Sequence, residues 1–271
     1  MSSANDEQSK HWNGAGGRAW LELQAVVNQM LQPFSALLVQ GCSSGRVLDV
    51  GCGTGVTTIA VAQRTGSCVG VDISAPLLEA AREQAKQQGV NASFILADAQ
   101  THEFAAASFD RVISRFGVMF FDNPTAAFTN LRRAASTGAE LHFIAWRGPA
   151  ENPFMTTAER AAAPLLPEPP TPRPDAPGPF GLADRDRTAR ILGDSGWADI
   201  DIQPIDVAAT MPEKELIRYF TGLGALGRVW PQADATTRAR LIEAVRPAFD
   251  PFVHGAEVRF TAACWIVRAR A

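Results

Sequence analysis

The chain has 271 residues, of which 46% are hydrophobic, and it carries a formal net charge of −3 with a pI near 5.8. This length suits one enlarged domain with a sizeable core, and the charge balance gives no broad basic surface for a nucleic-acid backbone. No stretch approaches the ~20 apolar residues of a membrane span, and the first residues lack the apolar core of a signal peptide.

The four cysteines are scattered along the chain, without Cys-x-x-Cys spacing or companion histidines. Unpaired, scattered cysteines are typical of a reducing compartment, and they do not make a metal site. We therefore expect a cytoplasmic protein without a structural metal.

The first forty residues are predicted to form a helical flap. Residues 1–10 are polar and are interpreted as a disordered tail, whereas residues 17–40 carry apolar side chains at helical spacing. The flap would then be an amphipathic helical region with a free leading end.

Residues 46–55 place an apolar strand directly before a glycine-rich turn and a helix. Gly51, Gly53 and Gly55 suit the turn because a side chain would forbid its dihedral angles or hold a ligand away from the main chain. The N–H groups at the start of the following helix then face the ligand, with the positive end of the helix dipole behind them. The pattern predicts a cradle for a small anionic ligand.

The next two apolar runs each end in an acid. Asp72 lies 23 positions after Asp49, where a carboxylate can accept the hydroxyl hydrogen bonds of a ribose. Asp98 ends the third run and is placed to meet the edge of an adenine ring. A single acid at a strand end is usually a helix cap or a solvated charge, but three ligand-facing strand ends in succession favour a nucleoside.

Strands alternate with helices through the first half of the chain. The predicted strands are 46–50, 68–72, 93–97, 108–114 and 139–146, and the predicted helices lie near 55–65, 75–88 and 124–135. This alternation predicts a doubly wound parallel α/β sheet of the Rossmann type, with the ligand at the carboxyl ends of its strands. We take residues 41–147 as the cofactor-binding core.

The composition changes after residue 147. Eight prolines fall between residues 164 and 179, so neither a helix nor a central strand is expected there. The segment is either a passive linker or an extended strap over the substrate mouth. Further along, the pattern predicts a helix over 184–195, a strand over 200–208, a helical pair over 213–227 and 234–248, and a final strand over 257–268. Residues 148–256 would form a proline-rich segment and helical substrate cap, and residues 257–271 the last strand.

The glycine spacing distinguishes between two classes of cofactor. A dinucleotide fingerprint requires glycine at position 56, where this chain has Val56, so a pyrophosphate would fit poorly. At this point the chain resembles the class I S-adenosylmethionine-dependent methyltransferases, in particular the ubiquinone and menaquinone methyltransferase-like group. The residues that carry the resemblance are Leu-Asp-Val-Gly-Cys-Gly-Thr-Gly at 48–55, Val-Asp-Ile-Ser at 71–74, Ala-Asp-Ala at 97–99 and Ser-Phe-Asp-Arg-Val-Ile-Ser at 108–114.

The resemblance covers roughly residues 10–147 and implies both a fold and a cofactor. The fold is a seven-stranded, mostly parallel sheet with an antiparallel C-terminal strand at its edge. The cofactor is S-adenosylmethionine, which leaves as S-adenosylhomocysteine. The residues implied or suggested to bind it are Arg18, Asp49, Gly51, Cys52, Gly53, Asp72, Ile73, Asp98, Ala99 and Ser114.

Methyl transfer from a sulfonium asks for an acceptor lone pair held in line with the carbon–sulfur bond, and a base only where the acceptor keeps its proton. No base is assigned. His11 is the candidate to test first, because the neighbouring Trp12-Asn13-Gly14 is similar to the amino-terminal flap of the family. The alternative for each histidine is a hydrogen-bonded structural role.

Aromatic residues suggest an apolar or aromatic acceptor, since they would line a dry pocket. The alternative is that these side chains belong to the core. The predicted acceptor-binding residues are Trp12, Arg115, Phe116, Met119, Phe120, Trp146 and Phe180.

We therefore expect a methyltransferase that acts on a small molecule, without a nucleic-acid partner. Oxygen is slightly favoured over nitrogen or carbon as the acceptor atom, because no acidic cluster suited to an amine follows the predicted strands. A non-catalytic cofactor-binding or scaffold protein and a nicotinamide-dependent oxidoreductase remain as alternatives. Monomer and homodimer are both open.

Overall fold

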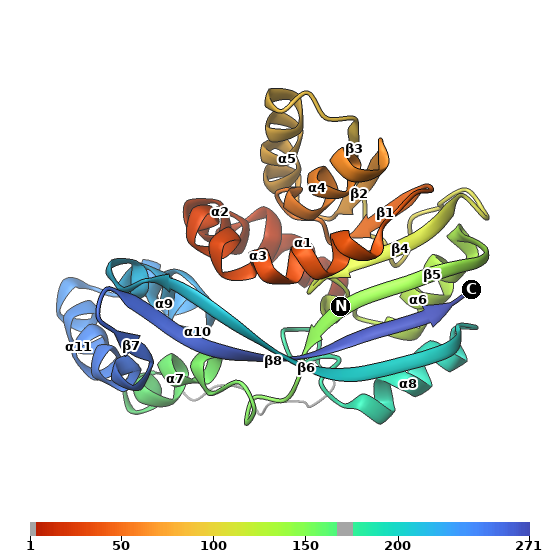
Figure 1. Cartoon of the computed structure of the whole chain (residues 1–271). Helices are drawn as coiled ribbons and strands as arrows, with labels where there is room; N and C mark the ends of the chain where they lie inside the picture. Colours follow the sequence, from red (N-terminus) through yellow and green to blue (C-terminus); the bar gives the residue numbers. More distant parts are fainter. Residues whose placement is uncertain (1–3, 167–175) are drawn as a thin grey trace.

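A twisted sheet of eight strands forms the centre of the computed structural model, which describes residues 4–166 and 176–271 (Figure 1). The strand order is β3-β2-β1-β4-β5-β8-β6, and β7 pairs with β8 off this path. The first five strands are parallel and β8 is antiparallel to both of its neighbours, as expected for the predicted doubly wound fold. The strands are β1 (Val47–Val50), β2 (Cys68–Asp72), β3 (Ala92–Leu96), β4 (Phe109–Arg115), β5 (Ala135–Trp146), β6 (Ala198–Pro212), β7 (Val253–His254) and β8 (Glu257–Arg270).

The position of the last strand corrects the prediction, because β8 is not at the edge of the sheet. It pairs with β5 from Cys264 to Arg270 and with β6 from Glu257 to Arg270, so β6 is the edge strand. Cys264 and Val267 of β8 are fully buried on opposite faces. A strand that is apolar on both faces belongs inside a sheet.

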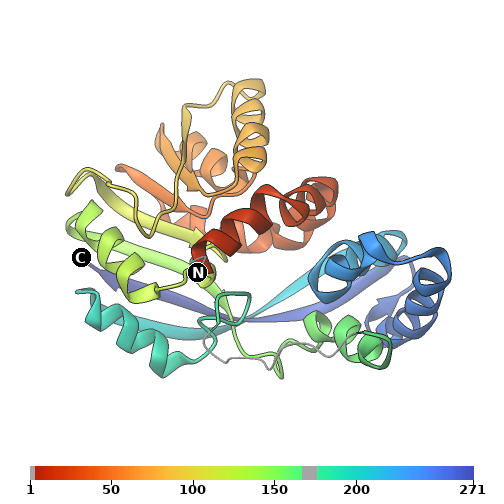
Figure 2. The same cartoon turned by 180° about the vertical axis from the view of Figure 1, so that it is seen from behind.

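Helices cover both faces of this sheet (Figures 1 and 2). The helices α3 (Gln24–Gly41), α4 (Val56–Thr65) and α5 (Ala75–Gln87) lie on one face, and α6 (Pro124–Ala134) and α8 (Arg185–Asp194) on the other. Asn123 and Asp184 cap α6 and α8 by accepting hydrogen bonds from the backbone N–H groups of Ala126 and Arg187. These elements agree with the predicted strand–helix alternation within a few residues.

The predicted disordered tail is wrong for the residues that the structure describes. Residues 4–13 form the helix α1 (Ala4–Asn13), which α2 (Ala15–Glu22) follows directly. Acidic residues begin α1 and basic residues end it, an arrangement that complements the helix dipole. The end of α1 is held by long-range hydrogen bonds: Ser74 Oγ donates to Trp12 O (2.7 Å) and Asn13 Nδ2 donates to Ile73 O (2.9 Å).

A second lobe forms where β6 and β8 run on together beyond the end of β5 (Figure 1). Its helices are α7 (Pro153–Ala162), α9 (Leu216–Gly222), α10 (Gly224–Val229) and α11 (Ala235–Val245), with 3-10 turns η2 (Ala163–Leu165), η3 (Glu213–Glu215), η4 (Trp230–Gln232) and η5 (Arg246–Phe252). The first of the two predicted cap helices is therefore broken, because Leu223 is extended and Gly224 has a φ of +68°. The proline-rich prediction falls largely on residues 167–175, which lie outside the described residues.

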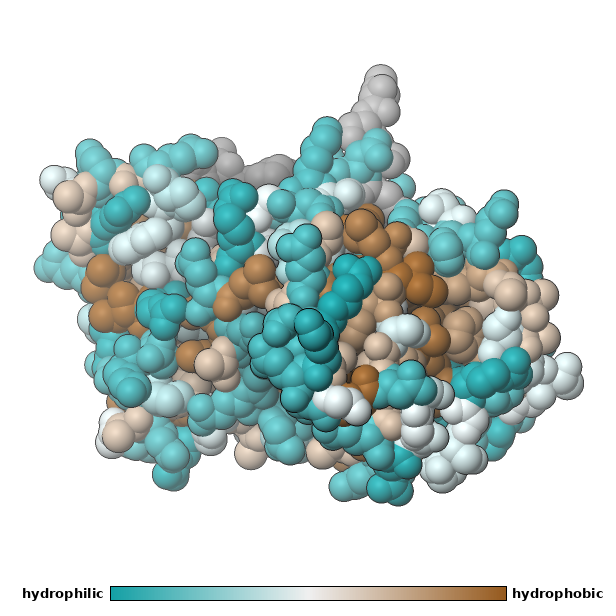
Figure 3. Space-filling model, turned by 90° about the horizontal axis from the view of Figure 1, so that it is seen from above, coloured by the Kyte–Doolittle hydropathy of each residue, from teal (hydrophilic) through white to brown (hydrophobic). Residues whose placement is uncertain are grey.

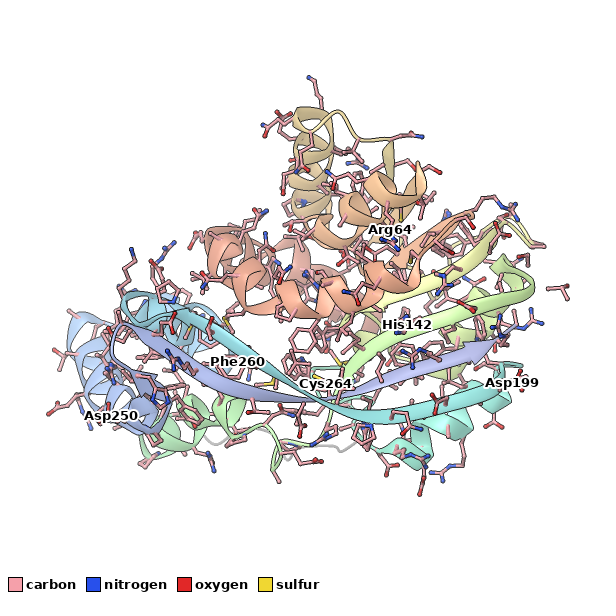
Figure 4. All side chains as sticks on the ribbon, viewed as in Figure 1. Arg64, His142, Asp199, Asp250, Phe260 and Cys264 are labelled. Atoms are coloured by element: carbon pink, nitrogen blue, oxygen red, sulfur yellow. The ribbon has the colours of Figure 1, made fainter. Side chains whose placement is uncertain are left out.

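The lobe has a core of its own, to which α3 contributes two side chains. Phe154 of α7 stacks on Phe260 of β8 with ring centroids 3.9 Å apart, and Figure 4 shows Phe260 on the part of β8 that enters the lobe. The buried residues of this second core are Val26, Met30, Phe154, Ala162, Met211, Leu216, Phe220, Leu226, Leu241, Val245, Phe249 and Val258.

The surface in the view from above is mostly polar, with apolar side chains gathered in separate patches (Figure 3). No helix in the described ranges has the length and apolar character needed to cross a bilayer.

Candidate cofactor site

The glycine turn after β1 makes a close backbone contact with the segment after β4. Gly51, Gly53 and Gly55 have φ values of +67°, +55° and +78°, which glycine adopts without strain. A Cβ atom on Gly51 would lie 2.6 Å from the Cα atom of Gly117, and one on Gly117 would lie 2.5 Å from the carbonyl oxygen of Val50. Gly117 was missed in the sequence, although a glycine three residues after a predicted strand end is a signal for such an approach.

Gly53 joins the ends of the first two strands. Its N–H group donates to Asp72 Oδ2 at 2.7 Å, and the N–H group of Ser74 donates to Asp72 Oδ1 at 2.9 Å. Burial raises the pKa of Asp72, and the backbone hydrogen bonds oppose this rise. A Cβ atom on Gly53 would have no described atom within 4 Å, so this point of the turn faces open space.

The end of β3 lies beside the end of β2, because the N–H group of Ala97 donates to the carbonyl oxygen of Asp72 at 3.0 Å. Asp98 follows, and its Oδ1 accepts from the N–H group of Gln100 at 2.9 Å. The carbonyl of Ala99 accepts from Asn130 Nδ2 at 2.9 Å. The structure thus brings Gly53, Asp72 and Asp98 to one continuous edge of the sheet.

A buried polar network lies beneath the turn. Asp49 is 1% exposed and accepts a hydrogen bond from Thr58 Oγ1 at 2.7 Å. Burial raises the pKa of Asp49 to about 7, while the Thr58 hydrogen bond and the positive charge of Arg115 oppose that rise. Arg115 Nη1 donates to Ser35 Oγ at 2.8 Å, and burial lowers the pKa of Arg115 to about 10. Arg115 is therefore tied to α3 and to the cofactor side of the sheet.

Ser114 ties this edge together through its side chain. Its Oγ atom donates to the carbonyl oxygen of Val50 at 2.7 Å and accepts from the N–H group of Gly117 at 3.1 Å. Cys52 is buried, and its N–H group donates to the carbonyl oxygen of Val71 at 3.1 Å. The side chain of Ser114 and the backbone of Cys52 thus both help to hold the turn in place.

Three of the predicted acceptor residues form a buried cluster. Phe116 has a φ of +62°, a strained value for a bulky residue, and stacks on Trp146 with ring centroids 4.4 Å apart. Phe34 of α3 packs against both rings. Met119 is 2% exposed, and its sulfur lies 3.4 Å from the N–H group of Trp146. Phe116 and Trp146 are 8% and 9% exposed, so these residues serve mainly as core beneath the site.

A second aromatic group joins the flap to the turn η1 (Val118–Phe120). The ring of Trp12 packs edge-on against Phe120 (5.6 Å) and Trp20 (5.8 Å). Next to them, the N–H group of Gly178 donates to the carbonyl oxygen of Met119 at 3.1 Å, which brings the segment carrying Phe180 to η1. The flap and the end of the proline-rich segment therefore meet beside the strand ends.

His11 and Arg18, the two predicted candidates on the flap, both lie at the surface. His11 packs edge-on against Trp12, and partial desolvation of its ring together with the charge of Arg228 lowers its pKa. Arg18 has no ion pair within residues 4–166 and 176–271. Arg147, which follows β5, is paired with Glu151 (2.7 Å) and Asp206 (3.0 Å).

Of two surface hollows, one adjoins the Asp98–Ala99 segment and the other lies in the second lobe. One, of about 510 Å³, is lined by residues of α6 together with Gln100 and Asn123. The other, of about 350 Å³, lies between α7 and β8 and includes Phe154 and Phe260. We base the site on the strand ends, because the converging polar groups lie there rather than in either hollow.

Residues 47–138 match the family model described as a methyltransferase domain. The chain is 36% identical over 102 residues to aklanonic acid methyltransferase DauC of Streptomyces sp. (strain C5). The aligned part is 36% of this chain and 46% of that protein. It is 27% identical over 169 residues to demethylmenaquinone methyltransferase of Renibacterium salmoninarum, covering 59% and 70% of the two chains. Several curated relatives match over less than half of their own length.

Among solved structures, phosphoethanolamine N-methyltransferase 2 of Haemonchus contortus in complex with S-adenosyl-L-methionine aligns with a TM-score of 0.60 at 16% identity, over 100% of this chain and 60% of that one. At this identity the likeness concerns the fold alone. Residues 47–138 are therefore a methyltransferase domain, and the strand order and the structural likeness give it the fold of the class I S-adenosylmethionine-dependent enzymes.

Proposed function

We propose that this protein transfers a methyl group from S-adenosylmethionine to a small-molecule acceptor. The observation that carries the proposal is the hydrogen bond between Gly53 N–H and Asp72, because it fixes a carboxylate at the mouth of the glycine turn. A carboxylate at this point suits the two hydroxyl groups of a ribose, and the open space above Gly53 leaves room for the ligand.

The order of the strands assigns each part of the cofactor to a part of the sheet. Asp98 and Ala99 after β3, with Ile73 after β2, would hold the adenine, and Asp72 would hold the ribose. Gly51 and Gly53 after β1 would then face the methionine portion. The residues present fit the cofactor, since the acids and the open glycine turn lie along one edge of the sheet in this order.

The cofactor supplies an electrophilic methyl carbon, so the protein needs chiefly to position the acceptor and exclude water. Trp12, Trp20 and Phe120 support this role, because they form an apolar wall where the flap meets η1. Phe116 and Trp146 would act from beneath by holding the floor of the pocket rigid. His11 lies beside Trp12 and is the candidate for a base where the acceptor is protonated.

The acceptor that this wall favours is apolar or aromatic, with oxygen as the methylated atom. One matching relative is named for methylation of aklanonic acid, and this name supports a small-molecule acceptor. The pKa of His11 is lowered, so its imidazole is neutral at physiological pH and free to take a proton from a hydroxyl group.

The test has two stages. Titration calorimetry with S-adenosylmethionine, S-adenosylhomocysteine and NAD should give binding of the first two only. Incubation with cofactor labelled at the methyl group and a panel of phenols, carboxylic acids and amines should then transfer label to a phenol or an acid. Binding of NAD alone would contradict the proposal, and cofactor binding without transfer to any acceptor would instead favour a non-catalytic binder.

A further inference from the structure

We propose that Asn28 of α3 binds the amino-acid end of S-adenosylmethionine, accepting a hydrogen bond from its ammonium group. The inference rests on the proposed function. It starts from one atom: Asn28 Oδ1 is buried and has no hydrogen-bond partner among the residues that the structure describes. Buried polar atoms are nearly always paired, and leaving one unpaired costs about 1–3 kcal/mol, so each exception calls for an explanation.

The face of α3 that carries Asn28 is the face turned toward the cofactor side of the sheet. Asn28 and Ser35 lie two helical turns apart and so share one side of the helix. Ser35 Oγ accepts from Arg115 Nη1 and lies 3.2 Å from Thr57 Oγ1, which places that side against β4 and α4. Val26 and Met30 point another way, into the core of the second lobe.

The direction of α3 places Asn28 beyond the strand ends. The last residue of the helix, Gly41, lies beside His142 in the middle of β5, where a Cβ atom on Gly41 would be 3.3 Å from His142 Nδ1. Ser35 accepts a hydrogen bond from the guanidinium group of Arg115, the last residue of β4, and so lies within reach of the carboxyl end of that strand. Asn28 precedes Ser35 by seven residues in the same helix, which continues through Pro33, and this spacing corresponds to about 10.5 Å further from Gly41, beyond the end of β4.

The strand order then selects the part of the cofactor that Asn28 can reach. Adenine and ribose are assigned to β3 and β2, whereas β1 and β4 are next along the sheet and are covered by α3 and α4. The methionine portion therefore extends toward α3. The ammonium group of this portion can only donate hydrogen bonds, and the side-chain oxygen of Asn28 can only accept them, so the two groups are complementary.

The test compares the Asn28→Leu variant with the wild-type chain by calorimetry, using S-adenosylmethionine and 5′-methylthioadenosine. The second probe has the adenosine and thioether but lacks the amino-acid end. We expect the variant to bind S-adenosylmethionine roughly 10- to 100-fold more weakly, as for loss of a hydrogen bond to a charged group, and methylthioadenosine as tightly as the wild type does. The matched control is Gln32→Leu, an exposed position on the same helix, which should leave both affinities unchanged.

Thermal unfolding separates this role from a purely structural one. Because leucine removes an unpaired buried oxygen, the Asn28→Leu variant should unfold at the same or a higher temperature than the wild type while losing cofactor affinity. Unchanged affinity for S-adenosylmethionine would overturn the inference, and so would an equal loss for both probes. If the wild type binds neither probe, the proposed function itself fails, and that outcome is distinct from failure at Asn28.

Discussion

The backbone N–H group of Gly53 lies 2.7 Å from a carboxylate oxygen of Asp72, so the turn after one strand and the acid after the next form a single unit. The second oxygen of Asp72 is held by the N–H group of Ser74 at 2.9 Å. The backbone N–H groups of Gly53, Ser74 and Ile73 all interact with this carboxylate, which has about four lone-pair positions, so it keeps room for a further donor. The carboxylate is thus oriented in advance and still able to accept from a ligand.

Replacing Asp72 tests this unit directly. We expect Asp72→Ala to weaken S-adenosylmethionine binding by roughly 100-fold, since two hydrogen bonds between a carboxylate and ribose hydroxyl groups are lost. Calorimetry measures the affinity, and circular dichroism checks that the fold remains. A matched control is Asp194→Ala, an exposed acid at the end of α8, which should bind normally. Wild-type affinity in Asp72→Ala would remove the ribose assignment.

The contact between Gly117 and Gly51 predicts a loss of stability on adding a single methyl group. In Gly117→Ala the new Cβ would lie 2.5 Å from the carbonyl oxygen of Val50 and 2.7 Å from the Cα atom of Gly51. Relief of this clash requires a backbone shift, and we expect a loss of about 1–3 kcal/mol in the free energy of unfolding, measured with urea. Gly148→Ala is the control, because its Cβ would meet no described atom within 4 Å. Equal stability of the two variants would show that the turn can move freely.

His142 predicts a dependence of stability on pH. Burial, with smaller contributions from Arg268 and Arg111, lowers the pKa of His142 from 6.5 to about 4 (Figure 4). The unfolded chain therefore binds a proton more readily than the folded chain between these values. The free energy of unfolding is therefore unaffected by His142 protonation above pH 6.5. It decreases as the pH falls from 6.5 toward 4, by up to about 1.4 kcal/mol per pH unit.

The measurement is the urea unfolding free energy of the wild type and of His142→Leu across this range. The difference between the two should change with pH below 6.5 and remain constant above it. A constant difference down to pH 4 would mean that His142 titrates normally in the folded chain.

Asn13 predicts local rather than global loosening of the flap. Its side chain donates to the carbonyl oxygen of Ile73 and accepts from the N–H group of Ala75, each at 2.9 Å. In Asn13→Ala we expect faster amide hydrogen exchange in α1 and α2, with a loss of less than about 1 kcal/mol in global stability. Gln40→Ala, an exposed position on α3, should leave exchange in the flap unchanged. Unaltered exchange in Asn13→Ala would show that the aromatic contacts of Trp12 alone hold the flap.

The strand ends of the cofactor half could be predicted from the sequence because their signals are local. A strand, a glycine turn and a terminal acid are each encoded within about ten residues, and the parallel sheet brings Asp72 and Asp98 together. The position of β8 could not be found this way, because it depends on pairing with β5 and β6, which are far away in the chain. The fold of α1 was missed for a similar reason: a polar sequence is ordered there by contacts with Ile73, Ser74 and Ala75.

The candidate site residues also divide into those encoded by local motifs and those that depend on long-range contacts. Gly51, Gly53 and Asp72 lie within motifs, whereas Gly117 and Asn28 acquire their importance only from the backbone and the helix face that meet them in space. Phe116, Met119 and Trp146 were predicted to bind the acceptor. Their near-complete burial, however, makes them the floor of the site, a distinction that spacing along the chain does not contain.

The helix α3 belongs to both hydrophobic cores, since Val26 and Met30 enter the lobe while Val27 and Leu31 enter the core of the sheet. Unfolding of the sheet domain or of the second lobe would therefore remove packing contacts from the other. We expect heating in a calorimeter to give one cooperative unfolding transition. Because α3 links the core of the lobe to the hydrogen bond between Ser35 and Arg115, any displacement of the lobe end of this helix would also act on that contact below the glycine turn.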